Sequence, residues 1–453
     1  MDYVLIHPDD NVRVDLENGH KYAVRDIEKG EKVIKYGFPI GTATEEIKTG
    51  EHVHSHNLQT DLSGISDYIY KPDFKAVEAV KSAKINAYIR KNGDIGIRND
   101  IWIINTVGCV NKTAEIIARE TGAFSFPHPY GCSQLGGDHE RTQKILSGLI
   151  KHPNAGGVLV LGLGCENNNI VEMKKVLGGY DGERIRFLCV QDCKDEIGEG
   201  VKIINELKEI AKNDKRQEVP VSKLRIGMKC GGSDGLSGIT ANPLCGRITD
   251  RLTAMGGSAV LTEVPEMFGA EQILMNRCIN EKIFSQTVKL INDYKEYFVS
   301  HGQPVSENPS PGNKDGGITT LEEKSLGCVQ KGGTAPVTAV LTYGDTVKET
   351  GLNLLDGPGN DIVAVTNLTA AGCHIILFTT GRGTPLGAPV PTIKISTNTA
   401  LYEKKKHWID FDAQSGNEDE LFALLIDTAN GKDTKNELSA YREIAIFKDG
   451  VTL

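Results

Sequence analysis

The sequence has no apolar run approaching the roughly 20 residues that a helix needs to cross a bilayer. Its first residues, MDYVLIHPDD, lack the basic start and the apolar stretch of a signal peptide, so we expect a cytoplasmic protein that does not enter a membrane. An excess of positive charge is also missing. The formal net charge is −9, which gives no electrostatic footprint for nucleic acid, and the lysine run at 404–407 is too short to supply a local one.

The ten cysteines do not indicate a disulfide framework, because the chain lacks an export signal and a reducing compartment keeps thiols free. We expect free thiols or metal ligands at these positions. With 453 residues, of which 25% are charged, the chain is typical of a globular protein with more than one core. The 50 glycines predict many turns, and we expect three domains.

Short β-type runs fill the first 57 residues. VLI, RVDL, KYAVRDI, EKVIKYG and EHVHSHN alternate with glycine turns, which is typical of a small all-β module. A polar stretch from Gln59 to about Lys84 follows and predicts a linker. We place the β-module at 1–72 and the linker at 73–97.

Strands and helices alternate after this linker, which predicts parallel sheets flanked by helices and therefore an α/β fold class. A middle α/β domain is expected at 98–220, with a helix at 138–150 and strands at 101–107, 157–163 and 186–191. A second α/β domain is expected at 221–453, with strands at 224–229, 258–263, 361–366, 374–380 and 392–395. The Gly- and Pro-rich stretch from 307 to 338 is too long for a plain connection and predicts an active-site loop region.

Three cysteines of the middle domain lie in glycine turns: Cys109 in TVGCVN, Cys132 in YGCSQLG and Cys165 in GLGCENN. Each follows a predicted strand, and the carboxyl ends of parallel strands lie on one edge of a sheet, where ligands bind. We therefore expect the three thiols to converge on a soft or borderline metal ion, or on an iron–sulfur cluster with one open iron. The alternative is that they are buried apolar fillers beside tight turns.

Histidines are concentrated in the β-module. His52, His54 and His56 alternate in EHVHSHN, so on a strand their imidazoles would share one face, and His20 lies in the GHK turn. Such a stripe can bind a metal or a carboxylate, and we take His20 and His54 as candidate substrate-binding residues. The alternative is a solvated polar face.

The glycine-rich segment KCGGSDGLSG follows a predicted strand of the second α/β domain. Its backbone N–H groups suit an anion, and it lacks both GxxxxGK[ST] and GxGxxG, so we expect it to bind a carboxylate rather than a nucleotide. The alternative is an ordinary tight turn between a strand and a helix. Polar residues after other predicted strand ends extend this cleft, and Arg382 offers a planar fork for a carboxylate. The candidate catalytic residues are Asp234, Glu263 and Lys331, and the candidate substrate-binding residues are Ser233, Asn308, Arg382 and Thr384.

Long motifs along nearly the whole chain resemble the altronate and galactarate dehydratase family. They include GHKYAVRDI, GEHVHSHN, HPNAGGVLVLGLGCENN, CGGSDGLSGITANP, LTEVPEMFGAEQ, NPSPGNKDGGITTLEEKSLGC and FTTGRGTP. HSHN, EMFGAEQ and KKKHWIDFDA resemble the altronate branch rather than the galactarate branch. The resemblance implies an N-terminal β-clip module of the SAF type, a middle domain that forms a homodimer and a Rossmann-like C-terminal domain of unusual connectivity.

The same resemblance implies dependence on iron, as Fe²⁺ or as an iron–sulfur cluster, with Mn²⁺ as a substitute. It implies dehydration of D-altronate to 2-dehydro-3-deoxy-D-gluconate in hexuronate (galacturonate) breakdown, so the expected ligand is a small sugar acid. Two alternatives stay open. One is a lyase on the same scaffold that acts on galactarate or on a sulfonated hydroxy acid, and the other is a non-catalytic α/β sensor that carries the β-module.

Overall fold

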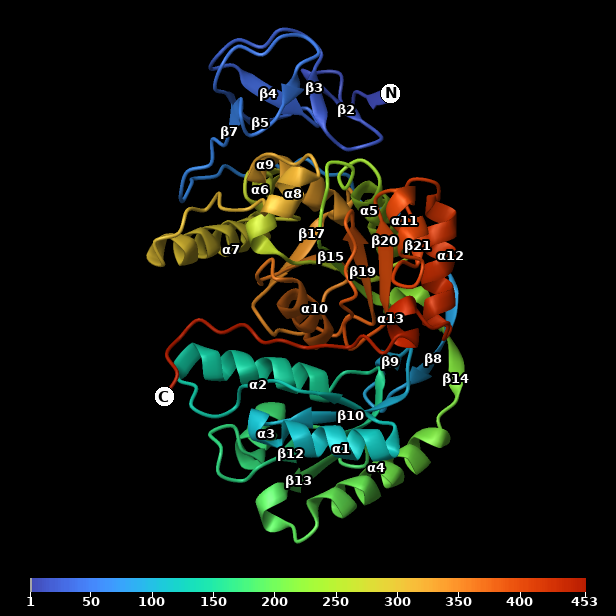
Figure 1. Ribbon diagram of the computed structural model, residues 1–453. Helices are drawn as coiled ribbons and strands as arrows, with labels where there is room; N and C mark the ends of the chain where they lie inside the picture. Colours follow the sequence, from blue (N-terminus) through green and yellow to red (C-terminus); the bar gives the residue numbers. More distant parts are fainter. Residues whose placement is uncertain (1) are drawn as a thin grey trace.

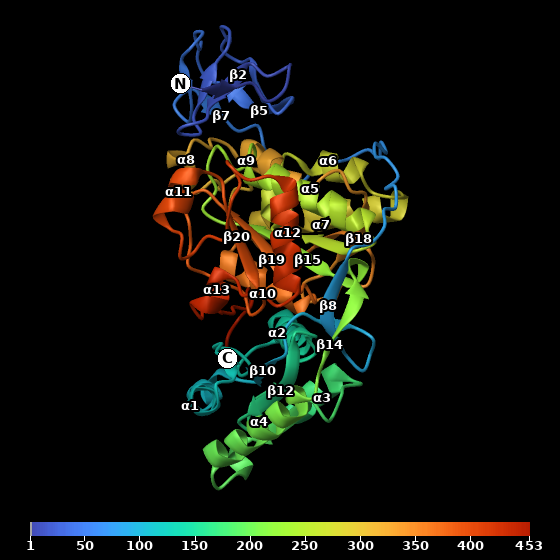
Figure 2. The same cartoon turned by 90° about the vertical axis from the view of Figure 1, so that its right-hand side faces the viewer.

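The computed structural model describes residues 2–453, which form three units stacked along one axis (Figure 1). The β-module lies at one end, and the C-terminal unit, which contains the C-terminal half of the chain, lies next to it. The unit formed by the preceding segment lies at the other end, and we call it the middle unit because of its place in the sequence. The turned view in Figure 2 keeps this order. Within the described residues, no helix is both long and apolar enough to span a membrane.

The N-terminal β-module consists of seven short strands in two antiparallel sheets, with the orders β1-β2-β3-β6 and β4-β5-β7. Alternate apolar side chains such as Val12, Val33 and Ile40 are buried inside the module, as the period of two predicts. The strands are β1 (Tyr3–Val4), β2 (Val12–Asp15), β3 (Lys21–Ala23), β4 (Lys32–Lys35), β5 (Phe38–Ala43), β6 (His52–Val53) and β7 (Leu58–Gln59).

Residues 60–83 carry no helix or strand in the described structure and run along the C-terminal unit. The hydroxyl of Tyr68 donates to Glu271 at 2.6 Å, and that of Tyr70 donates to the carbonyl of Cys278 at 2.6 Å. A small antiparallel sheet of order β14-β8-β9 follows, formed by β8 (Lys84–Ile89), β9 (Ile95–Gly96) and β14 (Arg216–Pro220). Since β8 and β14 pair, the middle unit is inserted between two adjacent strands.

The middle unit contains a parallel sheet of order β11-β10-β12-β13 with helices on both faces. Along β10, Ile101 and Ile103 pack with α1 and α4, whereas Trp102 and Ile104 pack in the cluster that includes α2 and α3. The elements are β10 (Asp100–Asn105), α1 (Asn111–Thr121), β11 (Phe124–Phe126), α2 (Gly136–Ile150), β12 (Ala155–Gly162), α3 (Ile170–Leu177), β13 (Ile185–Cys189) and α4 (Glu196–Lys212).

The C-terminal unit is built on a seven-stranded parallel sheet of order β17-β18-β16-β15-β19-β20-β21. From β15 the chain adds strands on one side through β16 and β18, then returns and adds β19 and β20 on the other side. This is a doubly wound, Rossmann-like arrangement, with its reversal point between β15 and β19. The strands are β15 (Arg225–Cys230), β16 (Ser258–Leu261), β17 (Val337–Leu341), β18 (Gly351–Leu355), β19 (Ile375–Thr380), β20 (Thr392–Ser396) and β21 (Phe411–Asp412).

Helices cover the C-terminal sheet and join it to the middle unit through α10 and α2, which pack together. A Cβ atom at Gly148 of α2 would lie 2.3 Å from the carbonyl oxygen of Ala370, so glycine is required for this close approach. The helices are α5 (Ala241–Ala254), α6 (Glu271–Asn276), α7 (Glu281–Ser300), α8 (Pro311–Asp315), α9 (Leu321–Cys328), α10 (Asp361–Ala370), α11 (Thr399–Lys404), α12 (Glu418–Ala429) and α13 (Lys435–Leu438).

The predicted fold class is confirmed: a small all-β module precedes two α/β units with parallel sheets, the second of them Rossmann-like. Two local predictions are wrong. The apolar run at 361–366 is the helix α10, capped by Asn360, because a short run that is buried on every side has no period that separates a strand from a helix. The strand β6 ends at Val53, so His54 and His56 lie in a turn rather than on a strand.

Candidate active site

The reversal point of the seven-stranded sheet carries a cavity of about 760 Å³. Here β15 ends at Cys230 and β19 ends at Thr380, and in open α/β sheets ligands bind in the crevice outside this point. The cavity is lined by the turn after β15, the 3₁₀ turn at Val264–Met267, the segment 307–314 and the loop 359–361. This edge of the sheet faces the β-module (Figure 1).

Two thiols and one carboxylate meet beside this cavity: Cys230 and Glu266 line it, and Cys328 contacts both of them. The sulfurs of Cys230 and Cys328 are 3.4 Å apart, and Glu266 Oε2 lies 3.0 Å from the first and 3.1 Å from the second. All three side chains are buried, and their ligand atoms lie within 4.8 Å of one another. Within residues 2–453 this is the one group of three or more Cys, His, Asp or Glu residues that is compact enough to hold a single metal ion.

Buried lysines surround this group. Lys324 Nζ lies 2.9 Å from Glu266 Oε1, on the side of the carboxylate that faces away from the thiols. Lys229 contacts Glu263 and lies 2.9 Å from Asp361, and Lys331 Nζ lies 3.4 Å from Glu263 Oε2. Each buried carboxylate is therefore paired with at least one cation, which is the condition for placing charge in the interior.

The pKa values of the buried groups follow from these contacts. Burial raises the pKa of a carboxyl group, but Lys324 and Lys229 hold the pKa of Glu266 well below its ordinary value. Burial and the neighbouring Glu266 raise the pKa of Glu263. The contact with Cys230, together with burial, raises the pKa of the Cys328 thiol.

Glu263 also has an unusual backbone conformation. Its φ of 69° lies in the left-handed region, which is uncommon for a residue with a side chain. The strained turn directs the Glu263 carboxylate back toward Cys230. Its Oε2 accepts a hydrogen bond from the backbone N–H of Cys230 at 3.0 Å. Such strain occurs at functional sites more often than elsewhere.

Of the predicted substrate-binding residues, Arg382 and Asn308 line the cavity. An N–H group of Arg382 donates to the carbonyl of Gly312 at 3.1 Å, which places the guanidinium at the rim. Asn308 Oδ1 accepts from Lys324 at 3.0 Å. Lys314, also in the cavity wall, adds a second cation at the rim.

The other predicted residues of this domain lie beside the cavity rather than in its lining. The Asp234 carboxylate accepts from Ser237 at 3.0 Å and from Thr397 at 2.8 Å, which holds the glycine-rich turn in place. Burial raises the pKa of this carboxyl group. The carbonyl of Ser233 accepts from Asn313 at 2.8 Å. Thr384, Glu263 and Lys331 are likewise absent from the cavity wall, so the roles predicted for these residues stay predictions.

The histidines of the β-module gather at the rim of the cavity. Nδ1 of His20 and Nε2 of His52 are 2.9 Å apart, and the stacked rings of His52 and His54 have centroids 5.3 Å apart. His54 Nε2 lies 2.9 Å from the carbonyl oxygen of Lys314. Burial lowers the pKa of His52 to about 4 and also lowers the pKa of His54. His20 and His54 are therefore close to the site, and substrate binding by them stays a prediction.

The predicted metal ligands Cys109, Cys132 and Cys165 lie in the middle unit, at the other end of the molecule from the β-module (Figures 1 and 2). All three are exposed free thiols. They belong to a different sheet edge from the cavity, and their role as metal ligands stays a prediction.

Sequence reasoning missed the two cysteines of the compact group. Cys230 lies in the segment KCGGSDG, and Cys328 opens CVQKGG, so both carry the same local signal as the three cysteines of the middle unit: a thiol beside glycines. Lys229 and Lys324 also went unnoticed, because a lysine in a strand or a helix is exposed in most proteins.

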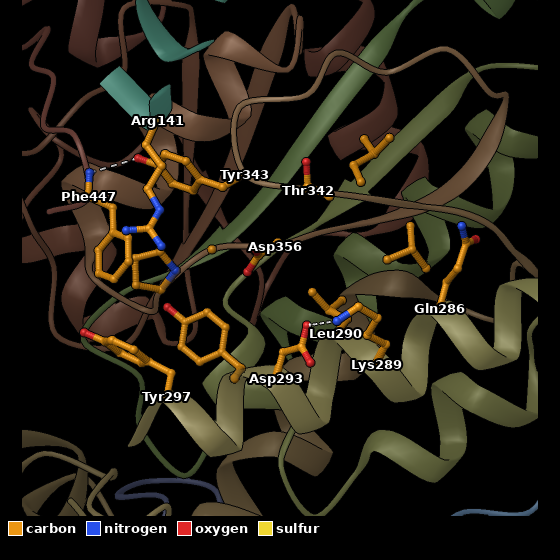
Figure 3. A pocket seen from close by; sticks show the side chains of 15 residues that line it. Arg141, Gln286, Lys289, Leu290, Asp293, Tyr297, Thr342, Tyr343, Asp356 and Phe447 are labelled. Atoms are coloured by element: carbon orange, nitrogen blue, oxygen red, sulfur yellow. Dashed lines mark hydrogen bonds and ion pairs between the residues drawn. The ribbon is translucent and has the colours of Figure 1, made fainter. Parts of the chain in front are cut away.

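A second cavity, of about 460 Å³, lies between the two α/β units (Figure 3). Arg141 reaches it from α2, and Tyr297 reaches it from α7. The hydroxyl of Tyr343 accepts the N–H of Phe447 at 3.0 Å. Residues 356–358 line this second cavity, and Gly359 and Asp361, which follow them in the chain, line the first cavity. Its described residues form no compact group of metal ligands, so we place the active site at the first cavity.

Comparison with known proteins gives matches along most of the chain. Residues 11–61 match the altronate/galactarate dehydratase SAF domain, residues 87–212 match the second domain of D-galactarate dehydratase/altronate hydrolase, and residues 221–452 match the C-terminal domain of D-galactarate/altronate dehydratase. The chain is 54% identical to the altronate dehydratase of Bacillus subtilis (strain 168) and 52% identical to that of Escherichia coli (strain K12), each over 98% of this chain and 93% of the relative. It is 28% identical to the galactarate dehydratase (L-threo-forming) of Escherichia coli (strain K12), over 95% of this chain and 90% of that protein.

Proposed function

The chain belongs to the altronate/galactarate dehydratase family, and on this premise we propose that it removes water from D-altronate to give 2-dehydro-3-deoxy-D-gluconate. The enzyme is a carbon–oxygen hydro-lyase, and this step belongs to hexuronate (galacturonate) breakdown. The observation that carries the proposal is the near full-length similarity to two altronate dehydratases, which is much closer than the similarity to galactarate dehydratase.

The cavity supports binding of a polyhydroxy carboxylate. Arg382 and Lys314 at the rim bind the carboxylate, and Asn308 offers an amide to a hydroxyl group. Dehydration removes the proton from the carbon next to the carboxylate and expels hydroxide from the neighbouring carbon. The enol that results tautomerises to the 2-keto-3-deoxy acid without further catalysis.

Proton transfer is assigned to Glu263, Lys331 and Asp234. Glu263 has the strongest support, because burial and Glu266 raise its pKa, as expected for a carboxyl group that transfers a proton. Lys331 lies 3.4 Å from it and can share that proton. Asp234, the third residue assigned to this step, lies beside the cavity, where its carboxylate accepts from Ser237 and Thr397 and burial raises its pKa.

Cys230, Glu266 and Cys328 are the proposed ligands of Fe²⁺, for which Mn²⁺ can substitute. Thiolate and carboxylate donors suit a divalent transition metal, which acts as a Lewis acid toward the substrate oxygens. The lysines, carboxylates and thiols of this site have no net charge when the three carboxylates are ionised, the three lysines are protonated and both thiols keep their protons. Loss of these two protons leaves two negative charges, which a divalent ion balances. The charged members are Lys229, Lys324, Lys331, Glu263, Glu266 and Asp361.

Product analysis tests the function. The purified full-length protein, loaded with ferrous iron under anaerobic conditions, is given D-altronate, galactarate and a sulfonated hydroxy acid in separate reactions. We expect 2-keto-3-deoxy acid from altronate at a rate well above that from the other two. Faster turnover of galactarate or release of sulfite would replace the proposal with one of these activities, and binding of altronate without turnover would support the non-catalytic sensor.

Metal analysis of matched variants tests the ligand assignment. Cys328→Ser and Glu266→Gln should lose the bound divalent metal and most activity, because each removes one of three ligands. Cys245→Ser is the control, since Cys245 is equally buried in the same domain but lies outside the compact group. Retention of the metal in both ligand variants would show that the metal binds elsewhere.

We also propose that the protein is a homodimer and that it acts in the cytoplasm. The apolar side chains of Val171 and Val176 on α3 of the middle unit are 62% and 40% exposed, which supports an interface on this unit. Sedimentation velocity of the full-length protein tests the dimer. A monomer at micromolar concentration would contradict it.

A further inference from the structure

Cys230 and Cys328 form the only contact between two thiols among residues 2–453. Their sulfurs are 3.4 Å apart, although the two residues are separated by 98 positions in the sequence. The two residues are 2% and 5% exposed, and both thiols are free. Two thiols in contact can form a disulfide, which is a reaction that the dehydratase function does not use.

The two sulfurs need only a short movement to form a bond. A disulfide is about 2.05 Å long, so the sulfurs must approach each other by roughly 1.4 Å. Cys230 is the last residue of β15, and Cys328 is the last residue of α9. Gly231 follows the first cysteine and Gly327 precedes the second, and glycine gives the backbone the freedom to adjust to the shorter distance.

Access to the two sulfurs selects a small oxidant. Cys230 lines the active-site cavity of about 760 Å³, whereas Cys328 is absent from its lining. A molecule only slightly larger than water can enter this cavity and reach the first sulfur. A bulky disulfide such as oxidised glutathione cannot, because thiol–disulfide exchange depends on direct access to a sulfur, and Cys230 is only 2% exposed.

We propose that hydrogen peroxide oxidises Cys230 and Cys328 to a disulfide, and that this bond prevents the two residues from holding a metal ion. In the first step the sulfur of Cys230 attacks one peroxide oxygen. The O–O bond breaks, and the products are a sulfenic acid on Cys230 and one water molecule. In the second step the sulfur of Cys328 attacks the sulfur of the sulfenic acid, the S–O bond breaks and a second water molecule leaves. The two thiols lose two electrons and two protons, and the peroxide is reduced to two molecules of water.

Glu266 is placed to accept the thiol protons. Its Oε2 lies 3.0 Å from the sulfur of Cys230 and 3.1 Å from that of Cys328, so each thiol donates to the same carboxylate oxygen. Lys324 lies 2.9 Å from the other oxygen and holds the carboxylate in this orientation. The proton then passes to the oxygen that leaves as water.

Oxidation and metal binding exclude each other because they use the same two sulfurs. A divalent ion binds cysteine as a thiolate, and a disulfide sulfur carries no negative charge. This part of the inference rests on the proposed function, in which Cys230, Glu266 and Cys328 are the metal ligands. The disulfide itself rests on the contact between the sulfurs and on their access, whichever sugar acid the enzyme dehydrates.

Other cysteines of the chain serve as internal controls. Cys109, Cys132 and Cys165 are exposed, so they should react with oxidised glutathione as well as with peroxide. Cys245 and Cys373 are each 0% exposed, and in the described part of the chain neither contacts a second sulfur. These two should stay reduced with both oxidants.

Peptide mapping of the full-length protein tests the disulfide. The protein is purified anaerobically, freed of metal with a chelator, and treated with a small excess of hydrogen peroxide or of oxidised glutathione. Remaining thiols are alkylated before digestion without reductant. After peroxide we expect a cross-linked peptide pair that contains Cys230 and Cys328, and after oxidised glutathione we expect adducts on exposed cysteines without this link. Sulfinic acid on Cys230 beside a free Cys328, or no reaction of either residue, would overturn the proposal.

Single variants separate the two steps. In Cys328→Ser the reaction should stop at the sulfenic acid on Cys230, which dimedone traps as a stable adduct. Cys230→Ser should give no such adduct on Cys328, because that sulfur does not line the cavity. Cys245→Ser should form the same link as the wild type. An adduct on Cys328 in Cys230→Ser, with none on Cys230 in Cys328→Ser, would overturn the order of the steps.

Metal analysis tests the exclusion. Cross-linked wild-type protein, freed of excess peroxide, should lose most of the Mn²⁺ binding that the reduced protein has, and dithiothreitol should restore it. Protein loaded with Mn²⁺ before peroxide treatment should form the link more slowly. Full Mn²⁺ binding by the cross-linked protein would overturn the exclusion and show that the metal has other ligands. A reduced, metal-loaded protein that forms the link after metal removal but never turns over altronate would count against the proposed function alone.

Discussion

At the scale of single residues, Arg382 has the geometry that a carboxylate substrate requires. Its guanidinium lies at the rim of the cavity, and one of its N–H groups is fixed by the carbonyl of Gly312. A planar fork with further donors pairs with a carboxylate through two parallel hydrogen bonds, which a lysine ammonium cannot do.

Arg382→Lys should lower kcat/KM for altronate by about 10- to 100-fold, because a hydrogen bond to a charged group contributes roughly 1.5–3 kcal/mol. Steady-state kinetics and thermal unfolding of the variant check this, and the melting temperature should not change. The matched control is Arg247→Lys on α5, which pairs with Glu418 at 3.7 Å and is not part of the cavity wall. Near-normal kinetics for Arg382→Lys would make Lys314 the better candidate for the carboxylate contact.

Asp356 lines the second cavity (Figure 3), and its carboxyl group makes the free energy of unfolding depend on pH. Burial raises the pKa of its carboxyl group from 3.8 to about 6, so between these values the folded protein binds a proton that the unfolded chain releases. The stabilisation is complete below pH 3.8 and is lost as the pH rises through about 6. The difference in unfolding free energy between the wild type and Asp356→Asn should therefore fall over this range and stay level above it.

Denaturant unfolding of both proteins at a series of pH values measures this difference, and the contributions of other titrating groups cancel in it. Asp345→Asn, at a partly exposed carboxylate that pairs with Lys144 at 3.3 Å, is the control. A difference that increases between pH 3.8 and about 6 would contradict the assignment.

At the scale of elements, buried charges attach the β-module to α9. Lys21 of β3 and Lys35 of β4 both lie 2.8 Å from the carboxylate of Glu323, and all three side chains are at most 1% exposed. Burial alone would raise the pKa of Glu323, but the two lysines lower it to about 2. The attachment places the histidines of the module at the rim of the cavity.

Glu323→Gln should weaken this attachment by about 3–5 kcal/mol, because it leaves two buried lysines without a carboxylate. The undocked population should then increase by more than about 100-fold, which limited proteolysis within residues 60–83 measures. The surface variant Glu46→Gln should have almost no effect, since that carboxylate is 59% exposed.

Acid should have the same effect as the substitution. The stabilisation by Glu323 is present above pH 4.5 and is lost as the pH falls through about 2. An unchanged cleavage rate in Glu323→Gln would show that apolar contacts hold the module in place.

At the scale of the whole molecule, the proposed metal ligands come from segments that are distant in the chain. Cys230 ends β15, Glu266 follows β16, and Cys328 ends α9. An ion that binds all three binds the folded protein and not the unfolded chain, so it stabilises the fold by mass action.

Removal of the metal should lower the melting temperature of the full-length protein. At free metal about 100 times the dissociation constant, binding contributes roughly 2.7 kcal/mol, which corresponds to about 5–10 °C for a domain of this size. Calorimetry before and after chelation measures the shift, which should be absent in Cys328→Ser and present in Cys245→Ser. If chelation lowers the melting temperature equally in the wild type, Cys328→Ser and Cys245→Ser, the metal that is removed binds at another site.

The sequence by itself determined the order of the three units and most of their strands. Short, continuous apolar runs identified β10, β12, β15 and β19, because a strand with both faces covered must be apolar along its length. The glycine turns after these strands predicted the sheet edge that holds the cavity. Periodicity failed at 361–366, where an apolar segment is buried on all sides and helix and strand look alike.

Only the tertiary structure decided which cysteines meet in a compact group. Cys109 and Cys328 have the same kind of neighbours in sequence, glycines at the end of an element, yet the first is exposed and the second is buried 3.4 Å from Cys230. Local sequence specifies the turn, whereas the direction of a side chain and its partner across 98 residues depend on how strands and helices pack. Glu263 and Lys331 were predicted, whereas Lys229 and Lys324 went unpredicted for the same reason, since a buried charge is stable only with a partner that the fold brings to it.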